Sequence, residues 1–149
     1  MKYWIFQGNP DADWLKGKKL IDDIKEDDYY IWSINQHKKE IQKYDVVLFL
    51  ISGPQGGIVS EFVILDVFEE KGQLFADMVR TLDFEPIIKR EQIKEIIPNN
   101  ALIKARVGTN FAITQEEYFK IMEINKERAM TPELLESIIN GDPEKKEAA

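Results

Sequence analysis

The fold is decided by the run Tyr44-Asp45-Val46-Val47-Leu48-Phe49-Leu50-Ile51, together with the apolar stretch that follows it at residues 58–68. The first run is continuous in β-branched and aliphatic residues, which is typical of a strand. A loop of turn-forming residues, Ser52-Gly53-Pro54-Gln55-Gly56-Gly57, separates the two. We therefore expect a long hairpin or meander at the centre of a sheet.

The segments around this hairpin predict a mixed α/β arrangement. Residues 2–7 alternate like a strand and end at the turn Gly8-Asn9-Pro10. Further strands are expected at residues 30–33, 84–88 and 102–107, and short helical segments at 15–25, 36–41 and 92–97. The run Thr114-Gln115-Glu116-Glu117 is a capping box that begins a helix. Thr131-Pro132 predicts the start of a last helix, which Gly141 ends before a charged tail.

Composition limits the function classes. The 149 residues carry a net charge of −7, no cysteine and one histidine. Without cysteine, disulfides and thiolate sites are excluded, and the single histidine leaves no His/Cys metal cluster, so we expect neither a metal nor a cofactor. The longest apolar run is too short to cross a bilayer, and the first residues lack a secretory signal, so a cytoplasmic location is expected. No heptad pattern favours a coiled coil, so a monomer is expected. The acidic charge disfavours long nucleic-acid footprints but permits small ones.

Enzyme classes find little support in the sequence. The glycine-rich loop at residues 52–57 lacks the Gly-Lys-Ser/Thr ending of a phosphate-binding loop. A serine triad would have to use His37, and no nucleophile elbow accompanies it. A general acid–base pair of carboxylates is possible in principle. The sequence therefore predicts a binding module and leaves hydrolysis as an alternative.

Four separated motifs, in the same order, resemble those of the EVE domain, a member of the PUA-like superfamily. They are Tyr3-Trp4-Ile5-Phe6-Gln7-Gly8-Asn9-Pro10-Asp11, Tyr44-Asp45-Val46-Val47-Leu48-Phe49, Gly57-Ile58-Val59 and Ile113-Thr114-Gln115-Glu116-Glu117-Tyr118. The resemblance implies an α+β fold: a bent, barrel-like mixed sheet with short peripheral helices and a helical C-terminus. We expect residues 1–128 to form this domain, and residues 129–149 to be a C-terminal helix and frayed charged tail on the same domain.

The resemblance also implies a site. EVE domains and their YTH-type relatives are read as binders of modified bases in DNA or RNA, and Trp32-Ser33 falls where the relatives have a cage tryptophan and a small polar residue. Gln7, Gly8 and Asn9 fall where these relatives use first-strand side chains and backbone to recognise the base edge. Two segments depart from the pattern. Ile34-Asn35-Gln36 replaces a common Ala-Arg-Asn, and Tyr44 replaces a turn glycine. The sequence does not decide which of Tyr30, Phe84 and Phe111 is the second aromatic of the cage.

The residues themselves support a base pocket centred on Trp32. Stacking on an aromatic side chain contributes about 1–3 kcal/mol per base, and a charged methylated base would add cation–π attraction. Asn9, Asn35, Ser33 and the loop residues Ser52, Gly53 and Gly56 could pair with the base edge. Lys39, Lys104 and Arg106 are the predicted phosphate contacts. Because extrusion from a duplex costs a few kcal/mol, single-stranded or flipped-out bases fit best.

Three alternatives remain at this stage. Trp32 could be an ordinary core residue, since aromatic side chains provide much of the burial in a small domain. The same pocket could serve a PUA-like hydrolase of the ASCH type, although the Gly-x-Lys-x-x-Glu-x-Arg signature of that group is absent from the sequence. It could also serve a small-ligand or protein-interaction domain.

Overall fold

The computed structural model describes residues 1–98, 100–104, 108–124 and 132–140. Six strands form one mixed sheet in the order β2-β5-β4-β3-β1-β6. Their bounds are β1 (Tyr3–Gly8), β2 (Tyr29–Ile34), β3 (Val46–Ile51), β4 (Gly57–Glu70), β5 (Gln73–Lys89) and β6 (Asn110–Ile113). Within this sheet the β1–β3 pair is parallel, and the other neighbours are antiparallel.

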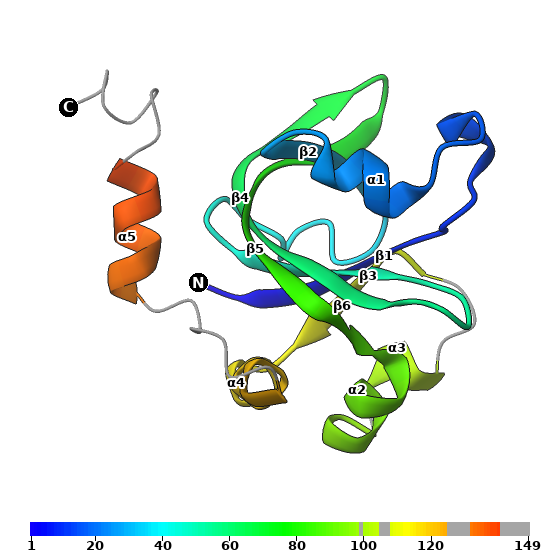
Figure 1. The fold of residues 1–149 in the computed structure, drawn as a ribbon. Helices are drawn as coiled ribbons and strands as arrows, with labels where there is room; N and C mark the ends of the chain where they lie inside the picture. Colours follow the sequence, from blue (N-terminus) through cyan, green and yellow to red (C-terminus); the bar gives the residue numbers. More distant parts are fainter. Residues whose placement is uncertain (99, 105–107, 125–131, 141–149) are drawn as a thin grey trace.

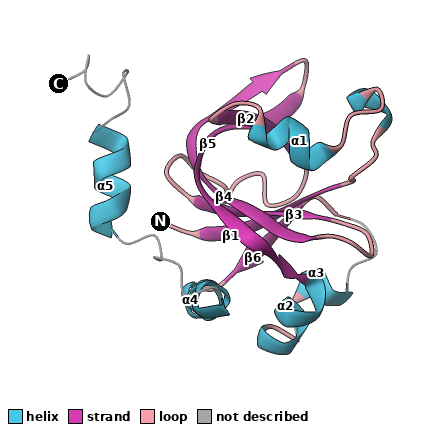
Figure 2. Ribbon diagram, in the orientation of Figure 1, coloured by secondary structure: helices cyan, strands magenta, loops and turns pink. Residues whose placement is uncertain are grey.

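The helices are short and lie outside the sheet (Figure 2). They are the 3-10 helix η1 (Asp13–Leu15) and the α-helices α1 (Leu20–Lys25), α2 (Arg90–Ile96), α3 (Ala101–Lys104), α4 (Gln115–Ile124) and α5 (Pro132–Asn140). β4 and β5 are long and strongly curved (Figure 1), and their pairing shifts register at three places, between Ile58 and Ser60, Glu61 and Phe62, and Ile64 and Asp66. Such irregularities increase the local bend and twist of a sheet. The predicted bent, mixed α+β fold is thus confirmed.

Backbone pairing leaves the sheet open, and one side chain joins its two outer strands. The Oδ1 atom of Asn110 in β6 accepts hydrogen bonds from the amides of Asn35 (2.7 Å) and Gln36 (3.2 Å). Its Nδ2 donates to the Ser33 carbonyl of β2 at 3.1 Å. Asn110 is 1% exposed, so these bonds are shielded from water. The bent sheet is therefore held near closure at the end where β2 terminates.

Two apolar clusters lie on the two faces of the sheet, as the alternation along β3 dictates. Val46, Leu48 and Leu50 face one cluster, which includes Ile93 of α2 and Tyr118 of α4. Val47, Phe49 and Ile51 face the other, which includes Leu20 and Ile24 of α1. Leu135 of α5 is buried in the first cluster. β3 thus carries the core on both of its faces.

Asp45, the aspartate of the motif that precedes β3, is buried and holds two strands together. It is 4% exposed, and its carboxylate accepts hydrogen bonds from Trp4 Nε1 (2.9 Å), the Lys2 amide (3.0 Å) and the Gln42 amide (2.9 Å). These bonds fix the start of β1 against the start of β3. Tyr44, one residue earlier, has a φ of 72°, in the left-handed region that favours glycine. Tyr44 therefore adopts a backbone conformation that a glycine would adopt without strain.

Most sequence expectations on secondary structure are confirmed. The β3–β4 hairpin and the start of α5 at Pro132 are present, and the helical segment expected at 92–97 is found at Arg90–Ile96. The capping box also forms, because the Thr114 amide donates to Glu117 Oε1 (2.8 Å) and the Glu117 amide to Thr114 Oγ1 (3.0 Å). Gly141 lies outside the described residues.

The short helical turn expected at residues 36–41 is present, because the His37 carbonyl accepts from the Glu40 and Ile41 amides. Two other expectations were wrong or incomplete. A strand was predicted at residues 102–107, but residues 101–104 are helical and 105–107 lie outside the described part of the chain. Strand β5 begins at Gln73, eleven residues before the predicted start at Phe84. Within the described ranges, no helix is both long and apolar enough to span a membrane.

Candidate base-binding site

Trp32 lies in β2, opposite Ala76 of β5, and is partly buried against the α1-side cluster. Its ring meets Phe49 edge-on at 4.9 Å between centroids and lies nearly parallel to Tyr30 at 6.1 Å. The ring also packs over Gly8, where a built Cβ would come within 2.9 Å of two Trp32 ring carbons and 2.6 Å of Leu20 Cδ2. Gly8 is therefore required for the indole to approach the end of β1.

The indole nitrogen of Trp32 is an unusual feature of this cluster. Nε1 is buried and has no hydrogen-bond partner among the described residues. Buried polar groups in folded proteins are nearly always paired, so an unpaired donor needs an explanation. By contrast, the Nε1 of Trp4 donates to Asp45. The Trp32 N–H is thus available to an acceptor that the described part of the chain does not supply.

A second tryptophan lies at the surface beside Trp32. Trp14 of η1 is 55% exposed, and its ring centroid is 6.0 Å from that of Trp32 at an interplanar angle of 59°. Both rings border an open depression of about 700 Å³. We call it the aromatic groove; its lining residues are Trp14, Asp23, Asp27, Tyr29, Tyr30, Ile31, Trp32, Ser33, Phe75 and Asp77. The sequence reasoning assigned no role to Trp14, although a tryptophan in the polar stretch after β1 was the available signal.

The other candidates for a second aromatic are separated by the sheet. Tyr30 lies beside Trp32, whereas Phe84 and Phe111 belong to the cluster on the opposite face. The Tyr30 hydroxyl donates to Asp23 Oδ2 at 2.7 Å. Burial, this hydrogen bond and the Asp23 charge all raise the pKa of Tyr30 above its usual value. Trp14 and Tyr30 are therefore the rings that the structure brings to Trp32.

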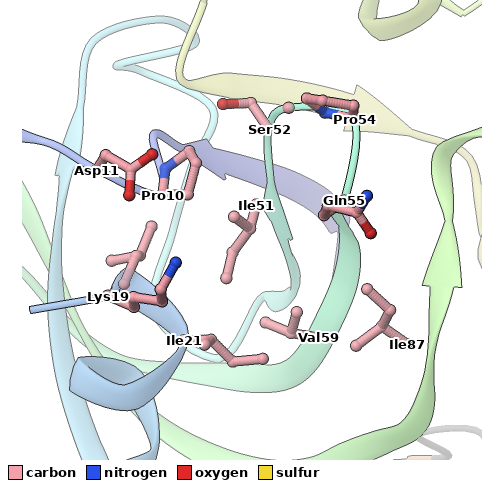
Figure 3. Close-up of a pocket in the computed structure, with 13 residues that line it drawn as sticks. Pro10, Asp11, Lys19, Ile21, Ile51, Ser52, Pro54, Gln55, Val59 and Ile87 are labelled. Atoms are coloured by element: carbon pink, nitrogen blue, oxygen red, sulfur yellow. The ribbon is translucent and has the colours of Figure 1, made fainter.

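A second hollow, of about 340 Å³, lies between α1 and the loop after β3 (Figure 3). We call it the loop cavity. Ile51, Val59 and Ile87 form its floor, and Ser52, Gly53 and Gly56 of the loop contribute to its wall, with Lys19 and Asp11 on the α1 side. Leu20 lines the loop cavity and also reaches Gly8 beside Trp32. The single pocket expected from the sequence is thus two neighbouring hollows.

The polar residues predicted to read a base edge are engaged in the fold. Gln7 donates to the Gly108 carbonyl (3.3 Å) and accepts from Arg90 (3.2 Å). Asn35 donates to Thr109 Oγ1 (3.0 Å) and Ser33 Oγ (3.3 Å) and accepts from Gln73 (3.1 Å). Asn9 is exposed and accepts from the Asp11 amide (3.0 Å). Of this set, only Ser33 lines the aromatic groove.

The predicted phosphate contacts are dispersed along the chain. Lys39 is exposed in the turn region before β3 and lines neither hollow. Lys104 is the last residue of α3. Arg106 lies outside the described residues. Of these three positions, the structure thus places only the side chain of Lys39, and it lies away from both hollows.

A strongly bent mixed sheet, flanked by short helices and with β1 between β3 and β6, defines an α+β domain fold. It superimposes on human THYN1 in complex with 5-methylcytosine-containing DNA with a TM-score of 0.69, at 14% identity, over 86% of this chain and 99% of that one. Protein Atu2648 from Agrobacterium tumefaciens gives a TM-score of 0.67 at 13% identity, covering 89% and 99%.

More distant similarity extends to an ASCH protein. The ASCH protein from Zymomonas mobilis superimposes with a TM-score of 0.53, at 9% identity, over 83% of this chain and 95% of that one. No family model matches the sequence, and no curated protein matches it. The comparisons therefore establish the fold.

Proposed function

We propose that this domain binds a modified base of DNA or RNA in the aromatic groove and catalyses no reaction on it. The observation that carries this proposal is the Trp14–Trp32 pair, one ring exposed and the other partly buried with an unpaired N–H. Aromatic faces stack any base, and the indole N–H and the Ser33 hydroxyl can pair with atoms of its edge. The complex of human THYN1, of similar fold, with 5-methylcytosine-containing DNA supports this proposal.

In this proposal the base enters beside Trp14 and stacks on Trp32. Because Nε1 of Trp32 is buried, a neighbouring side chain would move to admit a ligand acceptor, and we propose Trp14, whose ring contacts that of Trp32. The backbones of Gly8 and Asn9 would contact the ligand from the end of β1. The loop cavity, with Ser52, Gly53 and Gly56, would hold a flanking nucleotide, because Leu20 lines this cavity and also reaches Gly8 beside Trp32. Lys39, Lys104 and Arg106 remain proposed phosphate contacts.

Binding of short single-stranded oligonucleotides tests the proposal. A panel of DNA and RNA 9-mers, identical except for one modified base, is titrated against the protein by fluorescence anisotropy. We expect at least one modified base to bind tenfold more tightly than its unmodified parent. Trp14→Ala should abolish that preference without unfolding the protein, since Trp14 is 55% exposed. No preference for any modified base in the panel would refute the proposal.

Two controls separate the groove from the rest of the domain. Phe119→Ala removes an aromatic ring that packs against Tyr3 and Tyr118 on the opposite face, and should leave base preference unchanged. Mass spectrometry of the recovered oligonucleotide tests catalysis. An intact oligonucleotide supports a binding module, and a cleaved or altered base would favour the hydrolase alternative.

A further inference from the structure

The aromatic groove has a lining that favours cations. Five of its ten lining residues are aromatic (Trp14, Tyr29, Tyr30, Trp32 and Phe75), and three are aspartates (Asp23, Asp27 and Asp77). No lysine or arginine lines it among the residues that the structure describes. Aromatic faces attract cations through their quadrupoles, and carboxylates attract them through charge. An uncharged ligand can stack on the aromatic faces but gains no cation–π attraction, and it has no net charge for the carboxylates to attract.

The carboxylates of the groove are held by the fold. Asp23 accepts the Tyr30 hydroxyl hydrogen bond and lies 3.3 Å from Lys18 Nζ. Asp27 accepts from the Asp28 amide at 2.7 Å. Arg80 donates to the Ile24 and Asp27 carbonyls behind the groove and also lies 3.6 Å from Asp28. Lys18 and Arg80 thus offset part of the negative charge from outside the lining, while the lining itself keeps its acidic character.

This lining sets a condition on any nucleic-acid ligand. Carboxylates at the rim repel the phosphates on either side of a bound base, and the chain as a whole carries a net charge of −7. A neutral base therefore offers nothing to offset the repulsion. A base with a fixed positive charge does offset it, and its contact with the aromatic faces is strengthened as well.

Building on the proposed function, we infer that the preferred ligand is a base made cationic by methylation of a ring nitrogen. Examples of this class are 1-methyladenine, 3-methylcytosine and 7-methylguanine. Trp32 would supply the stacking face, and Asp27 and Asp77 the counter-charge. A methyl group on carbon or on an exocyclic amine leaves the base neutral, and such bases belong to the disfavoured class.

Isomeric oligonucleotides test the charge directly. A single-stranded 9-mer with 1-methyladenine is compared with the same 9-mer carrying N6-methyladenine, and 3-methylcytosine with 5-methylcytosine. The two members of each pair carry the same number of methyl groups and differ in charge. We expect the cationic isomer to bind at least tenfold more tightly in both pairs. Equal or weaker binding of the cationic isomers overturns this inference but leaves the proposed function standing if a neutral modified base binds.

Substitution of two lining aspartates and titration of a peptide probe complete the test. The double substitution Asp27→Asn/Asp77→Asn should reduce the cationic preference at least fivefold, with little effect on N6-methyladenine. The carboxamide at position 27 keeps an oxygen that can accept the hydrogen bond from the Asp28 amide. We therefore expect the fold to be preserved, and a thermal melt checks this. A trimethyllysine peptide is titrated in parallel. If that peptide binds and none of the oligonucleotides does, the groove is a protein-recognition cage, and both the inference and the proposed function fail.

Discussion

The amide of Asn35 donates a 2.7 Å hydrogen bond to the side chain of Asn110, although the two residues are 75 positions apart. This bond joins the end of β2 to β6, the opposite edge of the sheet. Trp32 lies three residues before Asn35, so the same bond fixes the segment that carries the indole. The geometry of the aromatic groove therefore depends on a contact outside the groove.

Asn110→Ala should lower the free energy of unfolding by about 3 kcal/mol, because the amides of Asn35 and Gln36 and the Ser33 carbonyl lose their partly buried partner. Urea unfolding measures the change. Asn9→Ala is the matched control, since this exposed side chain accepts one local hydrogen bond. The control should cost less than about 1 kcal/mol. Similar effects of the two substitutions would contradict the bridging role of Asn110.

Gly8→Ala should displace the Trp32 indole, because the added methyl group would come within 2.9 Å of its ring and 2.6 Å of Leu20. We expect a stability loss of about 1–3 kcal/mol from overpacking and a shift in tryptophan emission. Adding Leu20→Ala to this variant removes one of the two clashes. Because the clash with Trp32 remains, the emission shift should persist in the double variant. If Gly8→Ala leaves the tryptophan emission unchanged, the close approach of Trp32 to Gly8 is not what positions the ring.

Asp45→Ala should destabilise the domain by about 3 kcal/mol, since the indole N–H of Trp4 and two amides lose their acceptor. Asp45→Asn, which keeps one acceptor oxygen, should lose less. Hydrogen exchange at the Lys2 and Gln42 amides reports the loss locally. Unchanged protection at both amides in the alanine variant would argue against this network.

Glu61 should make stability depend on pH. It is 2% exposed, and burial raises the pKa of its carboxyl above the ordinary 4.5, against the hydrogen bonds from Tyr118 and Thr81, which lower it. A raised pKa in the folded state means that the unfolded state ionises first. The contribution of Glu61 to the free energy of unfolding is therefore fully present below about pH 4.5 and is lost as the pH rises through the folded-state pKa.

The variant Glu61→Gln should remove this decline. Relative to the wild-type protein, its stability in urea should increase as the pH is raised above 4.5. Glu85→Gln, at an exposed carboxylate paired with Lys25, serves as the control and should show little pH-dependent difference. A difference between Glu61→Gln and wild type that is constant with pH would exclude a shifted carboxyl.

The sequence predicted the elements whose pattern is strong. β3 is a continuous apolar run, and β4 is mostly apolar from Ile58 to Phe68, so a strand is the best fit to both. The first half of β5 was missed because Asp77, Arg80 and Thr81 interrupt its apolar residues. Residues 101–104 were misassigned because a run as short as Leu102-Ile103 fits a strand and a helix equally well.

The candidate site was predicted in part, for a similar reason. The approach of Trp32 to the end of β1 follows from the motifs, and Gly8 confirms that contact. The separation of Trp32 from the Ser52 loop depends on where Leu20 packs, which is a tertiary contact without a local signal. The engagement of Gln7 by Arg90 likewise joins residues 83 positions apart.

The position of β1 within the sheet has a consequence for synthesis on the ribosome. β1 is the first of the six strands to be made, yet its neighbours are β3 and β6, so one of its edges waits for residues 110–113. Until those residues leave the exit tunnel, that edge is open to pairing with other chains. Asn110 arrives with the same strand, and with it the bond that holds the Trp32 segment in place. The segment that carries Trp32 is thus fixed only once Asn110 is in place.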